Sequence, residues 1–212
     1  MKSILLAIAT LTSAYAGEFT ELFNGKDLTN WGGKGKTEHA GYEVKDGTIT
    51  STPKCRVLMT EKEYSNYVLQ FEFKLTSGAN NGLGIHYPGK GDAAYTGMEI
   101  QILDNTHKKY AGLKDYQFHG GLYTLVAAKK GHLKPVGEWN KETVTVSGPH
   151  VKVELNGVVI MEANLDEVNK SHPKHEGAKR RKGHIAFCGH GDIISVKNIK
   201  IKELAAGEKK EK

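Results

Sequence analysis

The fold is decided by the stretch Y-V-L-Q-F-E-F-K-L (residues 67–75), in which apolar and polar side chains alternate without interruption. In an extended chain such alternation puts all the apolar side chains on one face and all the polar ones on the other. The apolar face consists of Tyr67, Leu69, Phe71, Phe73 and Leu75. Burying each of these side chains contributes about 1.5–3 kcal/mol before the entropy of ordering is subtracted. The stretch therefore predicts a β-strand in the core.

The following stretch, G-A-N-N-G-L-G-I-H-Y-P-G-K-G-D-A-A-Y-T-G-M-E-I-Q-I-L-D (78–104), predicts two further strands, over 82–87 and 97–104, with a Gly-rich loop between them. In the second strand Met98, Ile100 and Ile102 share one face, and Glu99 and Gln101 share the other. A strand face with a carboxylate and an amide suits a groove that binds sugar. An ordinary half-exposed strand has the same pattern, so the spacing alone does not establish a site.

The last residue of this stretch, Asp104, falls with the apolar face. Its carboxylate joins the polar face only if a bulge at Leu103 turns the strand over, or if the strand ends there.

The rest of the chain continues as short strands and Gly-rich turns. The dipeptides Asp46-Gly47 and Asn156-Gly157 are typical of two-residue hairpin turns. Residues 164–182 are polar and weakly patterned and are interpreted as a surface insertion, and the chain shows no convincing long helix and no internal repeat. The remaining strands are expected over 19–23, 42–44, 48–50, 56–60, 122–128, 143–147, 151–155, 158–161, 183–188 and 194–204. This pattern predicts one all-β domain over 17–204, a sandwich of two antiparallel sheets or a jelly roll.

The first 16 residues have the features of a secretory signal peptide. Lys2 precedes an apolar run, and Ala14-Tyr15-Ala16 forms a small-residue cleavage site, while the run is too short to span a membrane. We therefore expect a mature chain that begins at Gly17 and is periplasmic or extracellular. No later segment is apolar enough to be a transmembrane helix, and residues 205–212 are expected to be a disordered basic tail.

The cysteine content leaves the redox state open. Cys55 and Cys188 are the two cysteines of the chain. An exported protein can form a disulfide, but two cysteines so far apart in sequence do not establish one. We expect two buried free thiols rather than a bridge.

The charge is moderately basic. The formal net charge of +6 becomes +5 once Lys2 leaves with the signal peptide. Much of the excess lies in the run K-R-R-K (179–182) and in the Lys-rich tail, with no aromatic side chains interleaved. These runs are interpreted as solvated charge, and a nucleic-acid partner is not expected.

Several segments resemble one known family, in order along nearly the whole mature chain. They are F-T-E-L-F-N-G-K-D-L-T-N-W (19–31), G-A-N-N-G-L-G-I-H-Y-P (78–88), G-D-A-A-Y-T-G-M-E-I-Q-I-L-D-N (91–105), Y-Q-F-H-G (116–120), L-K-P-V-G-E-W-N (133–140), L-N-G-V-V-I (155–160), G-H-G (189–191) and V-K-N-I-K-I-K-E-L (196–204). They resemble the 3-keto-disaccharide hydrolase domain family, which has a concanavalin A-like jelly-roll fold. The resemblance implies cleavage of the glycosidic bond of 3-ketoglycosides, made when a sugar 3-oxidoreductase oxidises the C3 hydroxyl.

One position departs from the family pattern. Relatives commonly carry Arg where this chain has His86. If that position contacts the keto-sugar, a fixed bidentate donor has become a titratable group. His86 is therefore a candidate substrate-binding residue, and the identity of the sugar is open.

A ketone at C3 acidifies the C2 proton, which favours proton abstraction at C2, loss of the C1 oxygen and later addition of water. This route needs a base, a group that stabilises the enolate oxygen and an acid for the leaving group. Glu99 and His119 are the catalytic candidates, in either order. A divalent cation is an alternative stabiliser, although the sequence identifies no ligand set for one. The candidates for substrate binding, or for orienting the catalytic groups, are His86, Tyr95, Gln101, Asp104, Tyr123 and Lys134.

Other aromatic and titratable residues have a structural interpretation. His190, between two glycines, is attributed to backbone geometry, and Trp31 and Trp139 to the core. His172 and His175 have the spacing of a ligand pair, but nothing nearby completes a zinc site.

Two rival functions remain open. One is a non-catalytic carbohydrate-binding module. The other is a laminarinase-type retaining glucanase, because E-x-Q-x-x-D at 99–104 keeps two carboxylates of the glucanase strand motif E-x-D-x-x-E. Retaining hydrolysis requires those carboxylates to lie about 5–5.5 Å apart.

Overall fold

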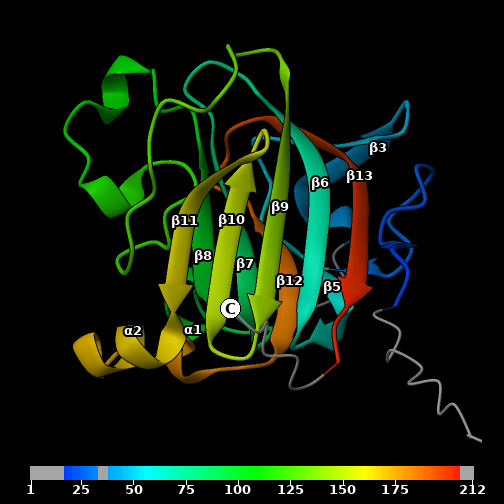
Figure 1. Cartoon of the computed structure of the whole chain (residues 1–212). Helices are drawn as coiled ribbons and strands as arrows, with labels where there is room; N and C mark the ends of the chain where they lie inside the picture. The colour runs from blue at the N-terminus through cyan, green and yellow to red at the C-terminus, as the bar shows by residue number, and fades with distance from the viewer. Residues whose placement is uncertain (1–16, 33–37, 206–212) are drawn as a thin grey trace, which may run out of the picture.

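The structure is a computed structural model that describes residues 17–32 and 38–205. Two antiparallel sheets pack face to face as a jelly-roll sandwich of the concanavalin A-like type (Figure 1). The predicted fold class is therefore confirmed. The predicted signal peptide, and all of the predicted tail except Ala205, lie outside the described residues.

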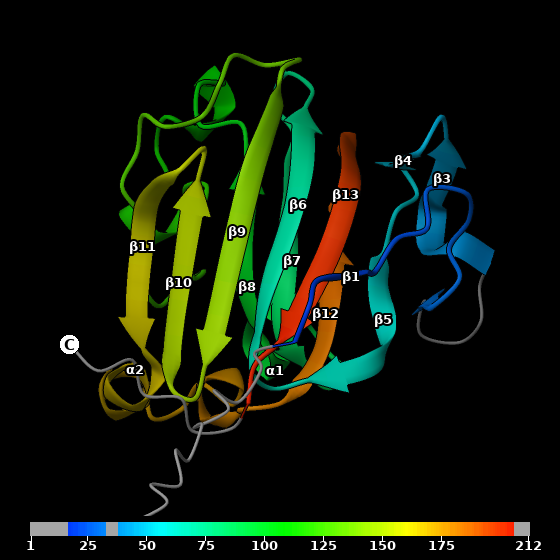
Figure 2. The same ribbon diagram turned by 45° about the vertical axis from the view of Figure 1, so that its right-hand side comes forward.

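The larger sheet has eight strands in the order β11-β10-β9-β6-β13-β4-β3, and β1 pairs separately with β13. This sheet faces the viewer in Figure 1, and Figure 2 shows β6 and β13 side by side near its middle. Its strands are β1 (Thr20–Glu21), β3 (Tyr42–Lys45), β4 (Thr48–Ser51), β6 (Tyr67–Leu75), β9 (Trp139–Ser147), β10 (His150–Leu155), β11 (Val158–Asn164) and β13 (Ile194–Glu203).

The smaller sheet has five strands in the order β2-β5-β12-β7-β8 and lies behind the larger one in Figure 1. Its strands are β2 (Trp31–Gly32), β5 (Val57–Tyr64), β7 (Asn80–Tyr87), β8 (Met98–Leu103) and β12 (Gly183–Cys188). In register, Glu99 of β8 lies opposite Gly84 of β7. β8 is an edge strand, and this leaves one side of it open to pairing with a loop.

The core lies between the sheets and has the alternation expected from the sequence. On β6 the five apolar side chains are at most 3% exposed, and the residues between them are partly exposed. On β8, Met98, Ile100 and Ile102 are fully buried in the same cluster. Glu99 and Gln101 alternate with these residues and therefore point to the outer face of the smaller sheet.

The segment predicted as a strand over 122–128 is not one. It contains two isolated bridges, Ile100↔Leu122 and Leu122↔Val126, and no continuous ladder. Leu122 turns into the core, and the backbone just before it bonds to the open edge of β8 instead of forming a strand of its own. Leu125, Val126 and Ala128 pack against the core, which explains why the segment has apolar residues without being a strand.

The helical elements are short. The predicted surface insertion contains α2 (Leu165–Ser171), which buries Leu165 and Val168, and the 3₁₀ turn η4 (Gly177–Lys179). The others are α1 (Ala93–Thr96) and the 3₁₀ turns η1 (Glu38–Gly41), η2 (Lys108–Tyr110) and η3 (Asp115–Gln117). No helix in the described part of the chain is long and apolar enough to cross a membrane.

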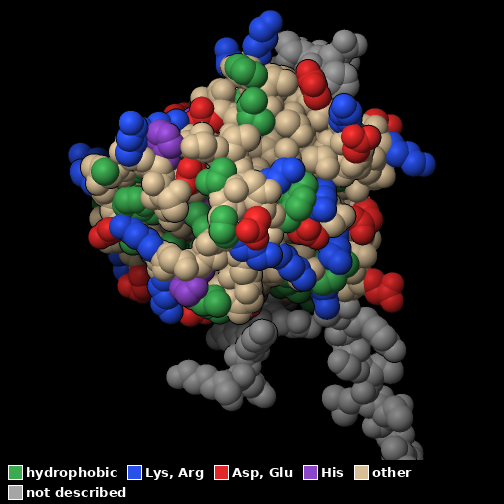
Figure 3. All heavy atoms as spheres, turned by 90° about the horizontal axis from the view of Figure 1, so that it is seen from above, with side chains coloured by type: hydrophobic (Ala, Val, Ile, Leu, Met, Phe, Trp, Pro, Cys, Tyr) green, Lys and Arg blue, Asp and Glu red, His purple; other side chains and the backbone are tan. Residues whose placement is uncertain are grey.

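The basic run bonds to the protein itself. Arg180 donates to the carbonyl of Thr96, and Arg181 pairs with Asp166. Lys179 and Lys182 pair with Glu176 and Glu63. At the opposite end of the sandwich, seen from above in Figure 3, side chains of both charges are also interspersed. The four side chains of the run thus form ion pairs or hydrogen bonds within the domain.

Candidate functional site

A carboxylate and an imidazole meet on the outer face of the smaller sheet. Oε1 of Glu99 and Nε2 of His190 lie 3.0 Å apart, in hydrogen-bonding geometry. The Glu99 side chain is 5% exposed and that of His190 is 42% exposed. The pair therefore combines a nearly buried carboxylate with a titratable group that solvent and ligand can reach.

The absence of a side chain at Gly82 on the neighbouring strand makes room for Glu99. A Cβ atom at Gly82 would lie 1.8 Å from Oε1 of Glu99, so any larger residue would displace the carboxylate. His190 is held from the other side by the turn that follows β12. The amide of Gly189 donates to the carbonyl of Arg56, and the amide of Gly191 donates to Sγ of Cys55. Both contacts join segments that are far apart in sequence.

The hydrogen bond makes His190 more basic. Its bond to Glu99 raises the pKa of His190 above the ordinary 6.5, against the opposing effect of partial burial. The protonated imidazolium is therefore present over a wider pH range than in a free histidine. This arrangement can supply a base and an acid side by side.

The second polar residue of β8, Gln101, faces the same way and is fixed by the loop beside it. Its side-chain amide donates to the carbonyl of Gln117 at 3.2 Å. The backbone of residues 120–123 forms hydrogen bonds with β8. The amide of Gly120 donates to the carbonyl of Gln101 at 2.8 Å, and the amide of Gln101 donates to the carbonyl of Gly121 at 3.0 Å. The amide of Tyr123 donates to the carbonyl of Glu99 at 2.8 Å. The loop thus extends the smaller sheet and brings Tyr123 next to Glu99.

Three tyrosines form a rim beside the pair. The ring of Tyr123 packs edge to face on Tyr95 and on Tyr116, at centroid distances of 6.4 and 6.3 Å. Tyr95 is 49% exposed. The rim therefore places aromatic surface next to Glu99.

The other catalytic candidate, His119, lies inside the sandwich. Nε2 of His119 and Oε2 of Glu142 on β9 are 3.1 Å apart but out of line for a hydrogen bond, and the side chains are 1% and 0% exposed. The amide of Leu103 donates to Nδ1 of His119 at 3.4 Å, and the ring packs on Phe73. A buried imidazole here cannot reach a ligand on the outer face, so the structure does not bring His119 together with Glu99.

Two further candidates, Asp104 and Lys134, are also held in structural positions. Asp104 follows the end of β8 and accepts from the amides of Gly78 and Thr106 and from the hydroxyl of Thr106. Burial raises the pKa of Asp104, but these hydrogen bonds outweigh it and the pKa is lowered overall. Lys134 donates to the carbonyl of Trp139 in the other sheet. Asp104 therefore orients neither His119 nor Lys134.

His86 is 1% exposed and adopts a left-handed backbone conformation (φ 51°). Burial lowers the pKa of His86 to about 4. Backbone groups of Ser65 and Arg180 lie close by, but neither ring nitrogen makes a well-aligned hydrogen bond. The side chain offers no accessible surface to a keto-sugar.

The remaining sequence candidates have structural positions as well. Trp31 stacks on Phe187 in the core, whereas Trp139 is partly exposed. His175 bonds to Ala94 and Ala178 and takes no part in a ligand pair with His172. Cys55 and Cys188 are both free and buried.

A divalent cation finds no protein ligand set in the described ranges 17–32 and 38–205. No group of three or more His, Cys, Asp or Glu side chains gathers there.

His190 is the member of the pair that the sequence analysis does not include among the catalytic candidates. Its position between two glycines is attributed there to backbone geometry. The only signal was G-H-G (189–191), one of the segments that resembles the family. Nothing in its local spacing indicates a partner 91 positions away.

Comparison with known families identifies the chain. Residues 18–202 match the model of the 3-keto-alpha-glucoside-1,2-lyase-like domain. The chain belongs to this family. The resemblance inferred from the sequence is therefore confirmed.

The relatives of this family member agree with that assignment. A 3-keto-disaccharide hydrolase of Bacteroides thetaiotaomicron is 24% identical, over 89% of this chain and 79% of the relative. The crystal structure of a candidate glycosyl hydrolase from Parabacteroides distasonis superposes with a TM-score of 0.80 at 27% identity, covering 89% of this chain and 94% of the other. The carbohydrate-binding module CBM66 of Bacillus subtilis, at 10% identity, has a TM-score of 0.56 over 82% of this chain and 96% of its own, and it shares the fold. Together the family and its hydrolase relatives support a carbohydrate-active function of the glycoside-cleaving kind.

Proposed function

We propose that the chain cleaves the glycosidic bond of 3-ketoglycosides at the outer face of the smaller sheet. The observation that carries the proposal is the pairing of Glu99 with His190 at 3.0 Å. Membership of the 3-keto-alpha-glucoside-1,2-lyase-like family and similarity to a 3-keto-disaccharide hydrolase indicate the substrate class.

Proton removal from C2 is the first step. The C3 ketone acidifies the C2–H bond, and Glu99 takes the proton as general base. The electron pair of that bond moves toward C3 and places negative charge on the former ketone oxygen. A carboxylate in an almost buried position is little hydrated, and this favours its action as a base.

Loss of the C1 oxygen is the second step. The enolate re-forms the ketone, a C1–C2 double bond forms, and the C1–O bond breaks. The departing oxygen takes a proton from the imidazolium of His190, whose pKa is raised by Glu99. Water then adds across the double bond, and the sum of the steps is hydrolysis. In this scheme Glu99 keeps the catalytic role predicted from the sequence, and His190 replaces His119.

The sugar is bound by the side chains around the pair. Gln101 presents its amide beside Glu99, and the tyrosine rim provides a stacking surface for the apolar face of a pyranose ring. Tyr95 and Tyr123 thus retain the substrate-binding role predicted from the sequence. We assign His119 a positioning role, because its ring fixes the end of β8 from the core side.

The substrate sets two further expectations. A 3-ketoglycoside arises by oxidation of a sugar C3 hydroxyl, so an oxidoreductase has to act first. Export, as the N-terminal sequence predicts, would place the cleavage in the periplasm or outside the cell.

Product analysis tests the reaction. The chain is incubated in heavy water with a 3-keto-β-glucoside and, as matched control, with the unoxidised β-glucoside. We expect release of the aglycone from the keto-sugar alone, with deuterium at C2 of the sugar product. An EDTA arm reports on a cation. Absence of turnover on keto-sugars would contradict the proposal and favour a binding module.

The glucanase alternative is disfavoured by the geometry. Its second carboxylate would be Asp104, which is 2% exposed and bonded to Gly78 and Thr106. Two carboxylates facing one glycosidic bond are therefore not formed from Glu99 and Asp104. Cleavage of an unoxidised β-glucan would overturn this conclusion.

A further inference from the structure

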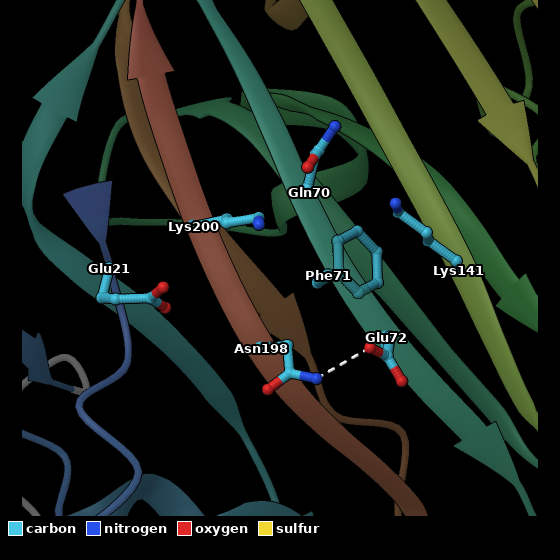
Figure 4. Close-up of a pocket in the computed structure, with 7 residues that line it drawn as sticks. All are labelled: Glu21, Gln70, Phe71, Glu72, Lys141, Asn198 and Lys200. Atoms are coloured by element: carbon cyan, nitrogen blue, oxygen red, sulfur yellow. Dashed lines mark hydrogen bonds between the residues drawn. The ribbon is translucent and has the colours of Figure 1, made fainter. Parts of the chain in front are cut away.

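The outer face of the larger sheet contains a hollow of about 190 Å³. Figure 4 shows its side chains coming from four strands, β1, β6, β9 and β13, around the backbone of β6 at Phe71. The polar lining residues are Glu21, Gln70, Glu72, Lys141, Asn198 and Lys200. Because the two sheets pack core to core, this hollow is on the opposite side of the sandwich from Glu99.

A bulge in β13 creates the hollow. The register between β13 and β6 shifts between Lys197 and Lys200. Asn198 lies in this bulge with φ 51°, a left-handed conformation that Asn tolerates better than most residues. Its side-chain amide donates to Oε1 of Glu72 at 2.7 Å, which fixes the bulge to β6. Bulges of this kind often redirect side chains at functional sites.

Some polar side chains around the hollow are already bonded within the protein, and others are not. Glu72 accepts from Asn198 and lies 3.7 Å from the ammonium group of Lys197. The side chains of Glu21, Gln70, Lys141 and Lys200 make no hydrogen bond or ion pair with any other described residue, although the Lys200 ammonium lies 5.5 Å from the centroid of the Phe19 ring. Side chains from β1, β6, β9 and β13 thus keep free donors and acceptors, while the bond from Asn198 to Glu72 holds β13 against β6.

The composition of the lining indicates a neutral ligand. Two carboxylates and two ammonium groups balance each other, which favours neither an anion nor a cation. Amides, carboxylates and lysines together are the donors and acceptors that match a polyhydroxylated ring. The hollow is smaller than the roughly 300–1,000 Å³ typical of sites for drug-sized ligands, so it suits one sugar residue.

We infer that this hollow is a second carbohydrate-binding site, specific for a neutral sugar unit and separate from the Glu99–His190 centre. It would hold a glycan on the side of the domain that does not carry the catalytic pair. The inference does not depend on the proposed reaction, since none of its residues contacts that centre in the described structure.

An NMR titration of the full chain tests this inference. The probes are cellotetraose, maltotetraose and laminaritetraose, all neutral and unoxidised. We expect at least one of them to shift the amide signals of residues 70–72, 141 and 198–200, with millimolar affinity. The Gln70→Ala/Lys141→Ala double variant should weaken that binding at least tenfold. Its rate on a small 3-keto-β-glucoside should equal that of the wild type.

The control variant is Lys152→Ala, which removes one partner of a partly exposed ion pair with Glu154 in β10 on the same outer face. It should bind like the wild type. The inference is overturned if none of the probes binds, if the double variant binds as tightly as the control, or if the shifted amides cluster around Glu99. A loss of keto-sugar cleavage with intact oligosaccharide binding would count against the proposed function only.

Discussion

Two glutamate–histidine pairs with nearly equal separations lie in different environments. Glu99 and His190 are 3.0 Å apart on the outer face of the smaller sheet, where the His190 side chain is 42% exposed. Glu142 and His119 are 3.1 Å apart inside the sandwich, where neither side chain is more than 1% exposed. The same two residue types therefore serve one position that a ligand can reach and one that it cannot.

The difference shows that accessibility and hydrogen bonding assign the roles. His190 is aligned with Glu99, and this bond raises the pKa of His190. Neither oxygen of Glu142 accepts a hydrogen bond from any described residue, so this carboxylate is buried without full compensation. A group in that position is out of reach of a ligand on the outer face.

The largest expected effect is on catalysis at the exposed pair. Glu99→Gln removes the base while keeping the shape of the side chain, so kcat/KM on a 3-keto-β-glucoside should fall about 10²–10⁴-fold, the usual contribution of a general base. Steady-state kinetics measures the loss, and thermal unfolding should show a native-like melting temperature. Activity within threefold of the wild type would remove Glu99 from the mechanism.

At the buried pair the main effect should be on stability. His119→Ala leaves a cavity beside Phe73 and removes the acceptor of the Leu103 amide, and such a truncation costs about 3–5 kcal/mol of unfolding free energy. Urea unfolding measures it. The double variant His119→Phe/Glu142→Leu replaces the pair with apolar side chains and should recover most of the loss. Substantial keto-sugar cleavage by this folded double variant would support a positioning role. A folded double variant with no activity would return His119 to the catalytic candidates.

A third histidine shows what burial does without a carboxylate partner. Burial lowers the pKa of His86 to about 4, so between pH 6.5 and 4 the folded state binds fewer protons than the unfolded state. The free energy of unfolding should therefore decrease as the pH is lowered through that window, by about 2–3 kcal/mol between pH 7 and pH 4.5. The control is His86→Asn, because Asn tolerates the positive φ of this position and does not titrate. Urea unfolding of both chains is compared over the same pH range. An equal loss in both chains would refute the prediction.

The smallest effect concerns pH at the exposed pair. Because the pKa of His190 is raised, the contribution of its protonated form to stability is fully present below pH 6.5. This contribution is lost as the pH rises through the raised pKa. The melting temperature of the wild type should exceed that of His190→Gln at pH 6, and the gap should close toward pH 9. The alkaline decline of kcat/KM should also disappear in the variant. A gap that stays constant with pH would separate His190 from this titration.

Local patterns were enough to predict most of the fold. The alternation over 67–75 and 98–102 placed the core and polar faces correctly, because side-chain direction in a strand has a period of two. The segment 122–128 was the exception, because only its first residues lie along the edge of β8 and the apolar residues after them pack against the core. Backbone pairing with an edge strand depends on which strand the fold brings next to the segment. It therefore leaves no periodic pattern in the sequence of the segment.

The sequence by itself determined the sandwich and the family, and it placed Glu99 on the polar face of its strand. Only the tertiary structure decided which histidine accompanies it. His119 and His190 both lie in Gly-flanked loops, and local spacing does not distinguish them. The turn at His190 is placed by backbone contact with Arg56, and the loop at His119 by its contacts with Leu103 and Phe73. These contacts join distant segments, so the position of each imidazole follows from the packing of the sheets.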